Sequence, residues 1–365
     1  MKIITFLLCF TFLLLSCEKE KPFNPVFTGN VTLKSQKEVD AFAAKGYTEI
    51  NGSLTIGASE DTDITDLSGL KSLTKIDGDL TIHKNVNLTE LDGLNNISTI
   101  GLSLEIYWNE ALTGLNGLSG LKTIGSLKSE SGGSGILIFN NNSLDNIDGL
   151  ANTALHEGAI VIAENPSLKN LNGFKSISGQ IRIIRIIGND ELHDITGLRG
   201  ITSIRTDGVS IGNNPRLSSL AGLENINYIA GFLSIDSNDV LLNLQGLNGL
   251  TEIGGGLTVY GNNSLTSIKE LGNLTAIGNN PMTGGNRLEL SVNPELISLE
   301  GLEKLKSLNG FLNISWNKGL RNFCAIKTLL ENESLVDGGE KDEYMVNGNA
   351  YNPTIQNIQN GNCVK

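Results

Sequence analysis

One four-residue motif recurs along the chain at a nearly constant interval. Leu-x-Gly-Leu, or a close variant of it, occupies residues 67–70, 91–94, 115–118, 147–150, 171–174, 195–198, 220–223, 244–247, 268–271, 299–302 and 323–326. Successive copies begin 24, 24, 32, 24, 24, 25, 24, 24, 31 and 24 residues apart. A fixed period of this length indicates stacked repeats and excludes an ordinary globular domain.

Each repeat is predicted to form one coil of a solenoid. Leu80-Thr81-Ile82 alternates like a half-buried strand, and the later Leu and Ile residues of the unit fall on the inside of the coil. One coil cannot bury its apolar edge alone, but stacked coils share one core. We therefore predict an all-β solenoid over residues 51–322, built from about eleven coils of 24 residues.

An asparagine precedes ten of the eleven motif copies at a fixed distance of six residues. The ten are Asn85, Asn109, Asn141, Asn165, Asn189, Asn214, Asn238, Asn262, Asn293 and Asn317, and Asp61 holds the equivalent place in the first coil. An asparagine at one turn can bond the backbone of its own and the adjacent coil. This row is predicted to be a structural ladder, with a row of ligands as the alternative.

Short caps are predicted at both ends of the solenoid. In the N-terminal cap, residues 28–50, Ser35 and Glu38 form a capping box for a helix that Gly46 ends. The C-terminal cap, residues 323–365, contains helix candidates at 324–331 and 352–361. Cys324 and Cys363 are predicted to form a disulfide, because they remain after processing in an oxidising compartment. The alternative, a two-cysteine metal site, lacks nearby histidines.

The N-terminus is predicted to be a processed leader. Lys2 precedes an apolar run, and residues 14–17, Leu-Leu-Ser-Cys, resemble a bacterial lipobox. This resemblance implies a signal peptide over 1–16, lipidation of Cys17 and a tether over 17–27, in the outer membrane of a Gram-negative bacterium. The charged run after Cys17 favours the cell surface, with the periplasmic face left open. An ordinary secretory signal is the alternative.

The repeats resemble the receptor L domain, the leucine-rich-repeat-like β-helix of insulin and epidermal growth factor receptors, and its bacterial lipoprotein relatives. The resemblance covers about residues 28–322 and is carried by the entry helix, by Gly52-Ser53-Leu54-Thr55-Ile56 as the first strand, and by the Leu-x-Gly-Leu coils. It implies a leucine-rich-repeat-like single-chain β-helix that binds extracellular partners through a sheet face, with no catalytic residues to carry over.

The sequence offers no pattern for catalysis, metal binding or cofactor binding. Its three histidines, His83, His156 and His193, fall at different phases of the coil, so they cannot converge on one metal. No carboxylate pair recurs at a spacing that would face two of them across a cleft. A net charge of −12 argues against a nucleic-acid partner. We expect no enzyme activity, no metal and no cofactor.

One part of the expected sheet face is unusually apolar. Outward positions of neighbouring coils become neighbours on the sheet, so one candidate ligand-binding patch emerges. It consists of Tyr107, Leu137, Phe139, Val161 and Ile187, with Trp108 at the margin and Glu105 and Arg185 as a polar rim. Such a patch suits a protein or a glycan partner. Alternatively, these side chains lie under the insertion near Ser126 to Gly135; a second insertion lies near Asn279 to Asn286.

The sequence thus predicts a lipid-anchored recognition or adhesion module. The competing predictions are a structural envelope component without a soluble ligand, and a catalytic accessory in glycan capture.

Overall fold

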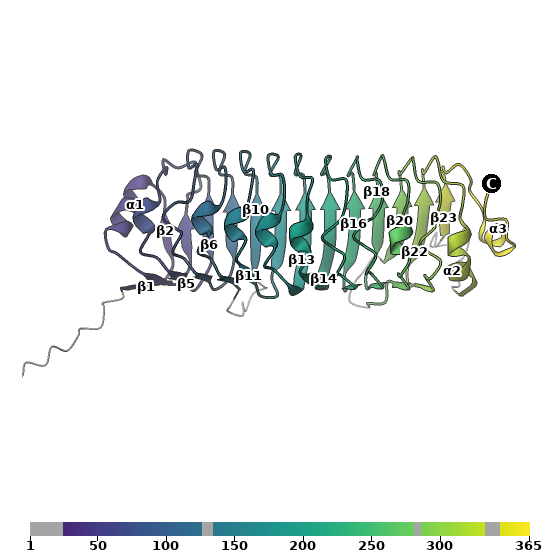
Figure 1. Ribbon diagram of the computed structural model, residues 1–365, viewed down its shortest axis with the longest axis horizontal. Coiled ribbons are helices and arrows are strands. Elements are labelled where there is room, and N and C mark those ends of the chain that lie inside the picture. Colours follow the sequence, from purple (N-terminus) through teal and green to yellow (C-terminus); the bar gives the residue numbers. More distant parts are fainter. Residues whose placement is uncertain (1–24, 126–133, 281–285, 333–343) are drawn as a thin grey trace, which may run out of the picture.

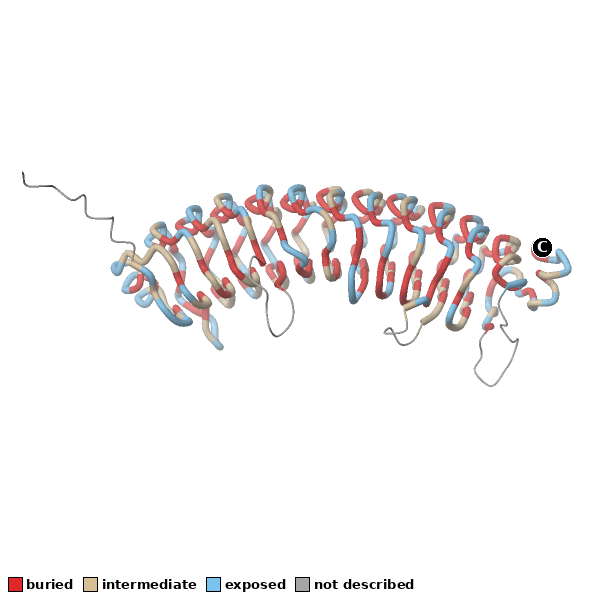
Figure 2. The backbone as a smooth tube through the Cα atoms, turned by 90° about the horizontal axis from the view of Figure 1, so that it is seen from below, coloured by how far each residue is buried: buried red, intermediate tan, exposed pale blue. Residues whose placement is uncertain are grey.

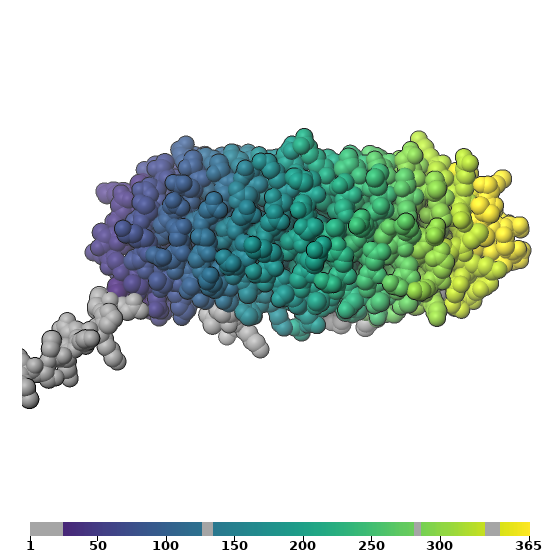
Figure 3. All heavy atoms as spheres, in the orientation of Figure 1, coloured from purple at the N-terminus to yellow at the C-terminus, as the bar shows by residue number. Residues whose placement is uncertain are grey.

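The computed structural model describes residues 25–125, 134–280, 286–332 and 344–365. They form a curved rod of stacked coils in which most regular structure is β-strand (Figures 1 and 2). The face in Figure 3 is one unbroken surface from the first coil to the last. The prediction of an all-β solenoid is confirmed.

A long parallel sheet, the main sheet, receives one strand from each coil. Its strands in spatial order are β2 (Val31–Leu33), β4 (Leu54–Ile56), β6 (Leu80–His83), β8 (Leu104–Tyr107), β10 (Gly135–Phe139), β12 (Ala159–Ala163), β13 (Gly179–Ile187), β14 (Ile201–Gly212), β16 (Phe232–Asp236), β18 (Leu257–Tyr260), β20 (Arg287–Ser291), β22 (Phe311–Ser315) and β23 (Tyr344–Asn347). Equivalent residues of successive coils pair, because the repeat length fixes the register.

A second sheet of short parallel strands runs along another side of the rod. It begins with β1 (Val26–Thr28), β3 (Glu49–Asn51), β5 (Lys75–Ile76), β7 (Thr99–Ile100), β9 (Thr123–Ile124) and β11 (Ala154–Leu155), and resumes with β15 (Tyr228–Ile229), β17 (Glu252–Ile253), β19 (Ala276–Ile277) and β21 (Ser307–Leu308). Between these runs, β13 and β14 are long enough to belong to both sheets.

The recurring motif forms tight 3-10 turns in seven coils. They are η1 (Ser68–Leu70), η2 (Asn116–Leu118), η3 (Asp148–Leu150), η4 (Asn172–Phe174), η5 (Thr196–Leu198), η6 (Lys269–Leu271) and η7 (Cys324–Ile326). The motif glycine lies against the preceding coil: a Cβ on Gly149 would be 1.8 Å from the carbonyl oxygen of Leu115. Glycine therefore allows the closest approach of coils here, although Glu270 and Ala325 hold the same place in two later coils.

The interior is one continuous core of Leu and Ile along the whole rod. Leu80 and Ile82 of β6 are fully buried, and the corresponding residues of the main-sheet strands from β4 to β22 are buried too. Figure 2 shows the same buried positions recurring coil after coil. Each coil covers the apolar edges of its two neighbours, as the repeat pattern predicted.

The asparagine row is a buried hydrogen-bonded ladder, as predicted. All ten asparagines have no exposed surface. Asn189 is typical: its Nδ2 donates to the carbonyls of Ile162 and Ile187 and to Oδ1 of Asn214, at 3.2 Å in each case. Its own Oδ1 accepts from the backbone N–H and the side chain of Asn165, at 3.2 and 3.4 Å.

The two ends of the ladder differ from the prediction. Asp61 is exposed, and Thr62 instead occupies the first rung, where its Oγ1 donates to Oδ1 of Asn85 at 2.7 Å. Because this coil is shorter by one residue, the hydroxyl of Thr62 lies where later coils have the side-chain amide of an asparagine. At the other end the ladder continues through Asn349, whose Oδ1 accepts from Asn317.

The N-terminal cap contains strands as well as the predicted helix. Helix α1 (Gln36–Ala43) begins after Ser35, whose side chain accepts from the backbone N–H of Glu38. The reciprocal bond differs, because the Glu38 carboxylate accepts from the N–H of Lys34 rather than of Ser35. The expectation that residues 52–56 form the first strand is wrong: β2 precedes α1 and pairs with β4.

The C-terminal cap extends the main sheet and is closed by the predicted disulfide. Helices α2 (Lys327–Asn332) and α3 (Ile355–Gln359) follow the last repeats, and β23 adds a strand beyond β22. Cys324 and Cys363 are bonded, with their Cα atoms 4.9 Å apart.

Replacing both cysteines by serine should weaken this cap. The disulfide closes a loop with a sequence separation of 39 residues, so its removal should lower the free energy of unfolding by about 4 kcal/mol. Because solenoid stability is largely local, we expect faster amide exchange in β22 and β23 than in β6. Exchange rates in β22 unchanged from the wild type would contradict the expectation.

Candidate functional site

The outward face of the main sheet is lined by two rows of side chains that run along the rod. The first row is Thr55, Thr81, Glu105, Leu137, Val161, Arg185, Ser210, Ser234, Thr258, Glu289, Asn313 and Met345. The second is His83, Tyr107, Phe139, Ala163, Ile187, Gly212, Asp236, Tyr260, Ser291, Ser315 and Asn347. Apolar and aromatic residues gather in the N-terminal half of both rows.

Four side chains form an aromatic cluster at the N-terminal end of these rows: His83, Tyr107, Trp108 and Phe139. The rings of Tyr107 and Phe139 are stacked, with centroids 4.7 Å apart and planes 2° apart. His83 stacks on Tyr107 at 5.0 Å. Trp108 meets both Tyr107 and Phe139 edge to face, at 5.2 and 6.4 Å. Both faces of the Tyr107 ring are therefore covered by neighbours in the row.

His83 is a member of this cluster that sequence reasoning considered only as a metal ligand. The sequence does contain a signal for this membership. His83 lies two residues after Thr81 and is equivalent to Tyr107 in the next coil.

The rest of the predicted patch lies beside the cluster. Leu137 and Val161 are neighbours in the first row, with Glu105 before them and Arg185 after them. Ile187 follows Phe139 in the second row, with Ala163 between the two. The register thus brings all the predicted patch residues onto one surface. The alternative that the insertion near Ser126 to Gly135 covers them concerns residues 126–133, which lie outside the described part of the chain, as do residues 281–285 of the second insertion.

Both tryptophans of the chain occupy the same position in the coil, directly after a main-sheet strand. Trp108 and Trp316 have φ angles of 56° and 61°, in the left-handed region that bulky residues rarely adopt. Their side chains are 44% and 59% exposed. Residues at the same position of other coils, Lys84, Asn140, Glu164, Asn213, Ser237 and Val292, are left-handed too, so this conformation belongs to the turn of the repeat. The periodicity places Trp316 in this position, which sequence analysis overlooked.

Burial alters the ionisation of three groups around the aromatic cluster. The pKa of Glu105 is raised by burial and, less strongly, by Asp79. Burial, followed by the charge of Glu105, raises the pKa of Tyr107. The pKa of His83 is lowered by burial and then by Lys84, which favours the neutral imidazole. The ammonium group of Lys84 lies 5.3 Å from the centre of the Trp108 ring.

Replacing Glu105 by glutamine should stabilise the fold at neutral pH. Since the folded-state pKa is raised, the stability associated with a protonated Glu105 is present at low pH and is lost as the pH rises through that pKa. Glutamine resembles the protonated form at every pH. Urea midpoints should therefore be higher for Glu105→Gln than for wild type at neutral pH and should converge below about pH 4.5, the ordinary value. Exposed Glu90 provides the control: equal gains from Glu90→Gln would refute the explanation.

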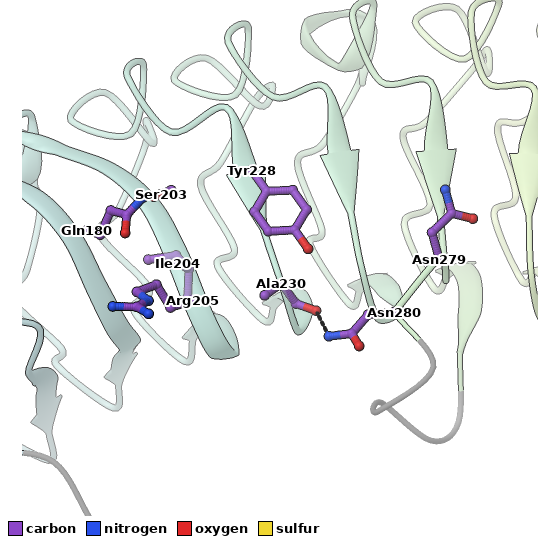
Figure 4. A pocket seen from close by; sticks show the side chains of 8 residues that line it. All are labelled: Gln180, Ser203, Ile204, Arg205, Tyr228, Ala230, Asn279 and Asn280. Atoms are coloured by element: carbon purple, nitrogen blue, oxygen red, sulfur yellow. Dashed lines mark hydrogen bonds between the residues drawn. The ribbon is translucent and has the colours of Figure 1, made fainter.

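A polar pocket opens where β14 and β15 pass the second insertion (Figure 4). Its volume is about 440 Å³, and it is lined by Gln180, Ser203, Ile204, Arg205, Tyr228, Ala230, Asn279 and Asn280. Sequence analysis noted Asn279 and Asn280 only as part of the second insertion, which could form the rim of a binding edge, and named none of the other lining residues. Polar side chains are ordinary on a solenoid surface, so only the convergence of these residues on one hollow distinguishes them from their neighbours.

Among the described residues, no three or more His, Cys, Asp or Glu side chains come together in an arrangement that could hold a metal ion.

Two parts of this solenoid are similar to a known protein family. Residues 46–104 and 225–335 match the receptor L domain. These two stretches support the receptor L, leucine-rich-repeat-like assignment made from the motif. Together they are less than half of the chain, and no curated protein matches. Among solved structures, a crystal structure of a TLR13–ssRNA13 complex has 14% sequence identity and a TM-score of 0.16; the alignment covers 87% of this chain and 63% of that chain.

The receptor L matches leave the aromatic cluster almost entirely outside. Tyr107, Trp108 and Phe139 lie between the two matched stretches, and only His83 falls within the first. The polar pocket is divided: Gln180 to Arg205 lie between the stretches, whereas Tyr228 to Asn280 lie in the second. The family match therefore includes part of the pocket and almost none of the aromatic cluster.

Proposed function

We propose that this chain is a lipid-anchored recognition module of a Gram-negative outer membrane, exposed at the cell surface, and that the patch around the aromatic cluster binds a protein partner. The carrying observation is that most apolar outward residues gather in a few neighbouring coils, with Tyr260 and Met345 as exceptions farther along the rod. Beyond Ile187, the two rows continue mainly with Ser, Thr, Gly, Asp, Glu and Asn. A solenoid used only as a spacer needs no such difference between its coils.

Ring geometry favours a protein over a glycan at this patch. Sugars stack on open aromatic faces, but those of Tyr107 are occupied by Phe139 and His83. The cluster presents ring edges and the partly exposed Trp108 to the outside. The aliphatic side chains of Leu137 and Val161 lie next to them. Apolar side chains of a protein partner pack well on such a surface, and buried aromatic residues commonly dominate binding energy. The proposal requires no catalysis and no cofactor.

A photo-crosslinking amino acid in place of Tyr107 tests the partner directly. We expect irradiation of intact cells to yield a covalent adduct of defined mass, and the additional change Phe139→Ser to reduce that adduct at least about tenfold. Tyr260 is a matched control, because it lies in the same outward row and is 44% exposed. No adduct at residue 107, or equal adducts at 107 and 260, would overturn the proposal.

The cellular location needs its own test. Among the described residues, no helix has the length and apolar character required to cross a bilayer. The proposed attachment is the lipid on Cys17, which lies outside the described residues. Protease added to intact cells should degrade this protein and spare a periplasmic control; its survival would overturn surface exposure. A Cys17→Ser variant should be released from membranes into the soluble fraction, and its retention would overturn the anchor.

A further inference from the structure

We propose that the protein partner of the patch presents an amphipathic α-helix along the rod, with a basic side chain opposite Glu105 and an acidic side chain opposite Arg185. This inference rests on the proposed function, because it names the element that the partner brings to the same surface. Its basis is the first outward row, in which four successive strands, β8, β10, β12 and β13, carry Glu105, Leu137, Val161 and Arg185.

The two charged ends of this stretch have no opposite charge within the chain. Among the described residues, neither Glu105 nor Arg185 takes part in an ion pair. Glu105 is half-buried, and its pKa is raised by burial and then by the charge of Asp79. Arg185 is exposed, and its neighbours in the row are the uncharged Val161 and Ser210. Both charges are therefore open to a partner.

A partner that packs on the two aliphatic side chains must also cover the charges beside them. Leu137 is adjacent to Glu105 in the row, and Val161 is adjacent to Arg185. A charge that is buried in an interface without a counterion weakens binding, because its lost hydration is not replaced. A close pair of opposite charges across the interface removes this cost and excludes wrong partners. The row thus selects a cation at one end of the contact and an anion at the other.

The spacing of the row fits a helix better than an extended segment. Neighbouring strands of a sheet are about 4.8 Å apart, so Glu105 and Arg185 lie about 14 Å apart along the rod. A helix rises about 5.4 Å per turn, so one residue per turn spans about 16 Å over three turns. An extended chain presents every second residue to one face, and three such steps span about 20 Å. Of the two, the helix keeps one side chain over each of the four strands.

The second outward row leaves room for an apolar side chain of such a helix. Ala163 lies between Phe139 and Ile187 in that row, on the same strand and the same face as Val161. A methyl group between two larger side chains leaves a depression beside Val161. Helices that dock in this way present anchors one turn apart. The expected order along the partner helix is therefore basic, apolar, apolar and acidic, one residue per turn.

Three synthetic peptides test this order with the full-length protein. All are fluorescent, alanine-rich helices that carry two leucines one turn apart and a charged residue one turn beyond each leucine. The charged residues are Lys and Glu in the first peptide, Lys at both ends in the second, and Glu at both ends in the third. By fluorescence anisotropy, we expect the Lys/Glu peptide to bind about tenfold more tightly than the other two, each of which loses one ion pair.

Charge reversal in the protein should change which peptide binds best. Glu105→Arg should shift the preference to the peptide with Glu at both ends, and Arg185→Glu to the peptide with Lys at both ends. Glu90→Arg and Arg321→Glu are matched controls, because both residues are exposed and lie outside the main sheet. They change the net charge equally and should leave the preference for the Lys/Glu peptide unaltered. Should Glu105→Arg lower the urea midpoint, Arg185→Glu decides, since its side chain is exposed.

Three results would overturn the inference: no binding of any peptide, equal affinities for all three, or a preference that Arg185→Glu leaves unchanged. The crosslink at residue 107 in intact cells tests the proposed function separately. An adduct in cells, together with peptides that bind regardless of their end charges, would keep a protein partner and remove the charged helix. Absence of the adduct would remove the proposed function itself.

Discussion

Replacing Asn189 by leucine is expected to lower the free energy of unfolding by about 5 kcal/mol. The side chain is fully buried and takes part in five hydrogen bonds that join three successive coils. Leucine fills a similar volume but leaves the amide of Asn165 and the carbonyl of Ile162 without these bonds, each at a cost of about 1–3 kcal/mol. Urea unfolding followed by circular dichroism measures the loss.

The shape of that unfolding curve is a second readout. Because a solenoid is stabilised by contacts between adjacent coils, weakening one central interface should separate the transition into two steps. The neighbouring exposed residue provides the control, and Asp190→Ala should unfold like the wild type. A loss below about 1 kcal/mol for Asn189→Leu would mean that the ladder is not a main source of cohesion between coils.

Gly149→Ala is expected to destabilise the solenoid by about 3 kcal/mol. The new Cβ would lie 1.8 Å from the carbonyl oxygen of Leu115 and 2.4 Å from its carbon. Backbone cannot yield as a flexible side chain can, so the two coils must separate and core contacts are lost on both sides. Soluble yield and the urea midpoint are the measurements.

Gly114 gives the matched control in the coil before. A Cβ on Gly114 would meet only the side chain of Asn146, at 3.1 Å. Gly114→Ala should therefore cost less than about 1 kcal/mol. Equal losses from the two substitutions would show that flexibility of the unfolded chain, rather than close approach of coils, explains the motif glycine.

The candidate patch shows how far the repeat register reaches and where it stops. Spacing alone placed Tyr107 next to Phe139 and Leu137 next to Val161, because equal coil lengths make equivalent residues neighbours. Spacing could not show that the Tyr107 and Phe139 rings stack face to face, since side-chain rotamers depend on all the neighbours at once. That orientation is what separates a protein-binding surface from a sugar-stacking one.

The polar pocket depends on departures from the repeat. Gln180 and Asn280 lie 100 positions apart in the sequence, yet they line one hollow because a bulge in β14 and a glycine-rich coil leave space between them. No periodic feature of the sequence encodes such a coincidence.

By itself, the sequence determined the solenoid, the asparagine ladder, the order of residues along the sheet face and the closing disulfide. These follow from a local rule, because each coil sees only its neighbours and a 24-residue period repeats the same contacts. Tertiary structure alone decided the first rung at Thr62, the extra strands β2 and β23, the ring orientations around Tyr107 and the pocket beside Tyr228. Each of these arises where the repeat is broken or ends, and there the outcome depends on packing between segments that the period does not relate.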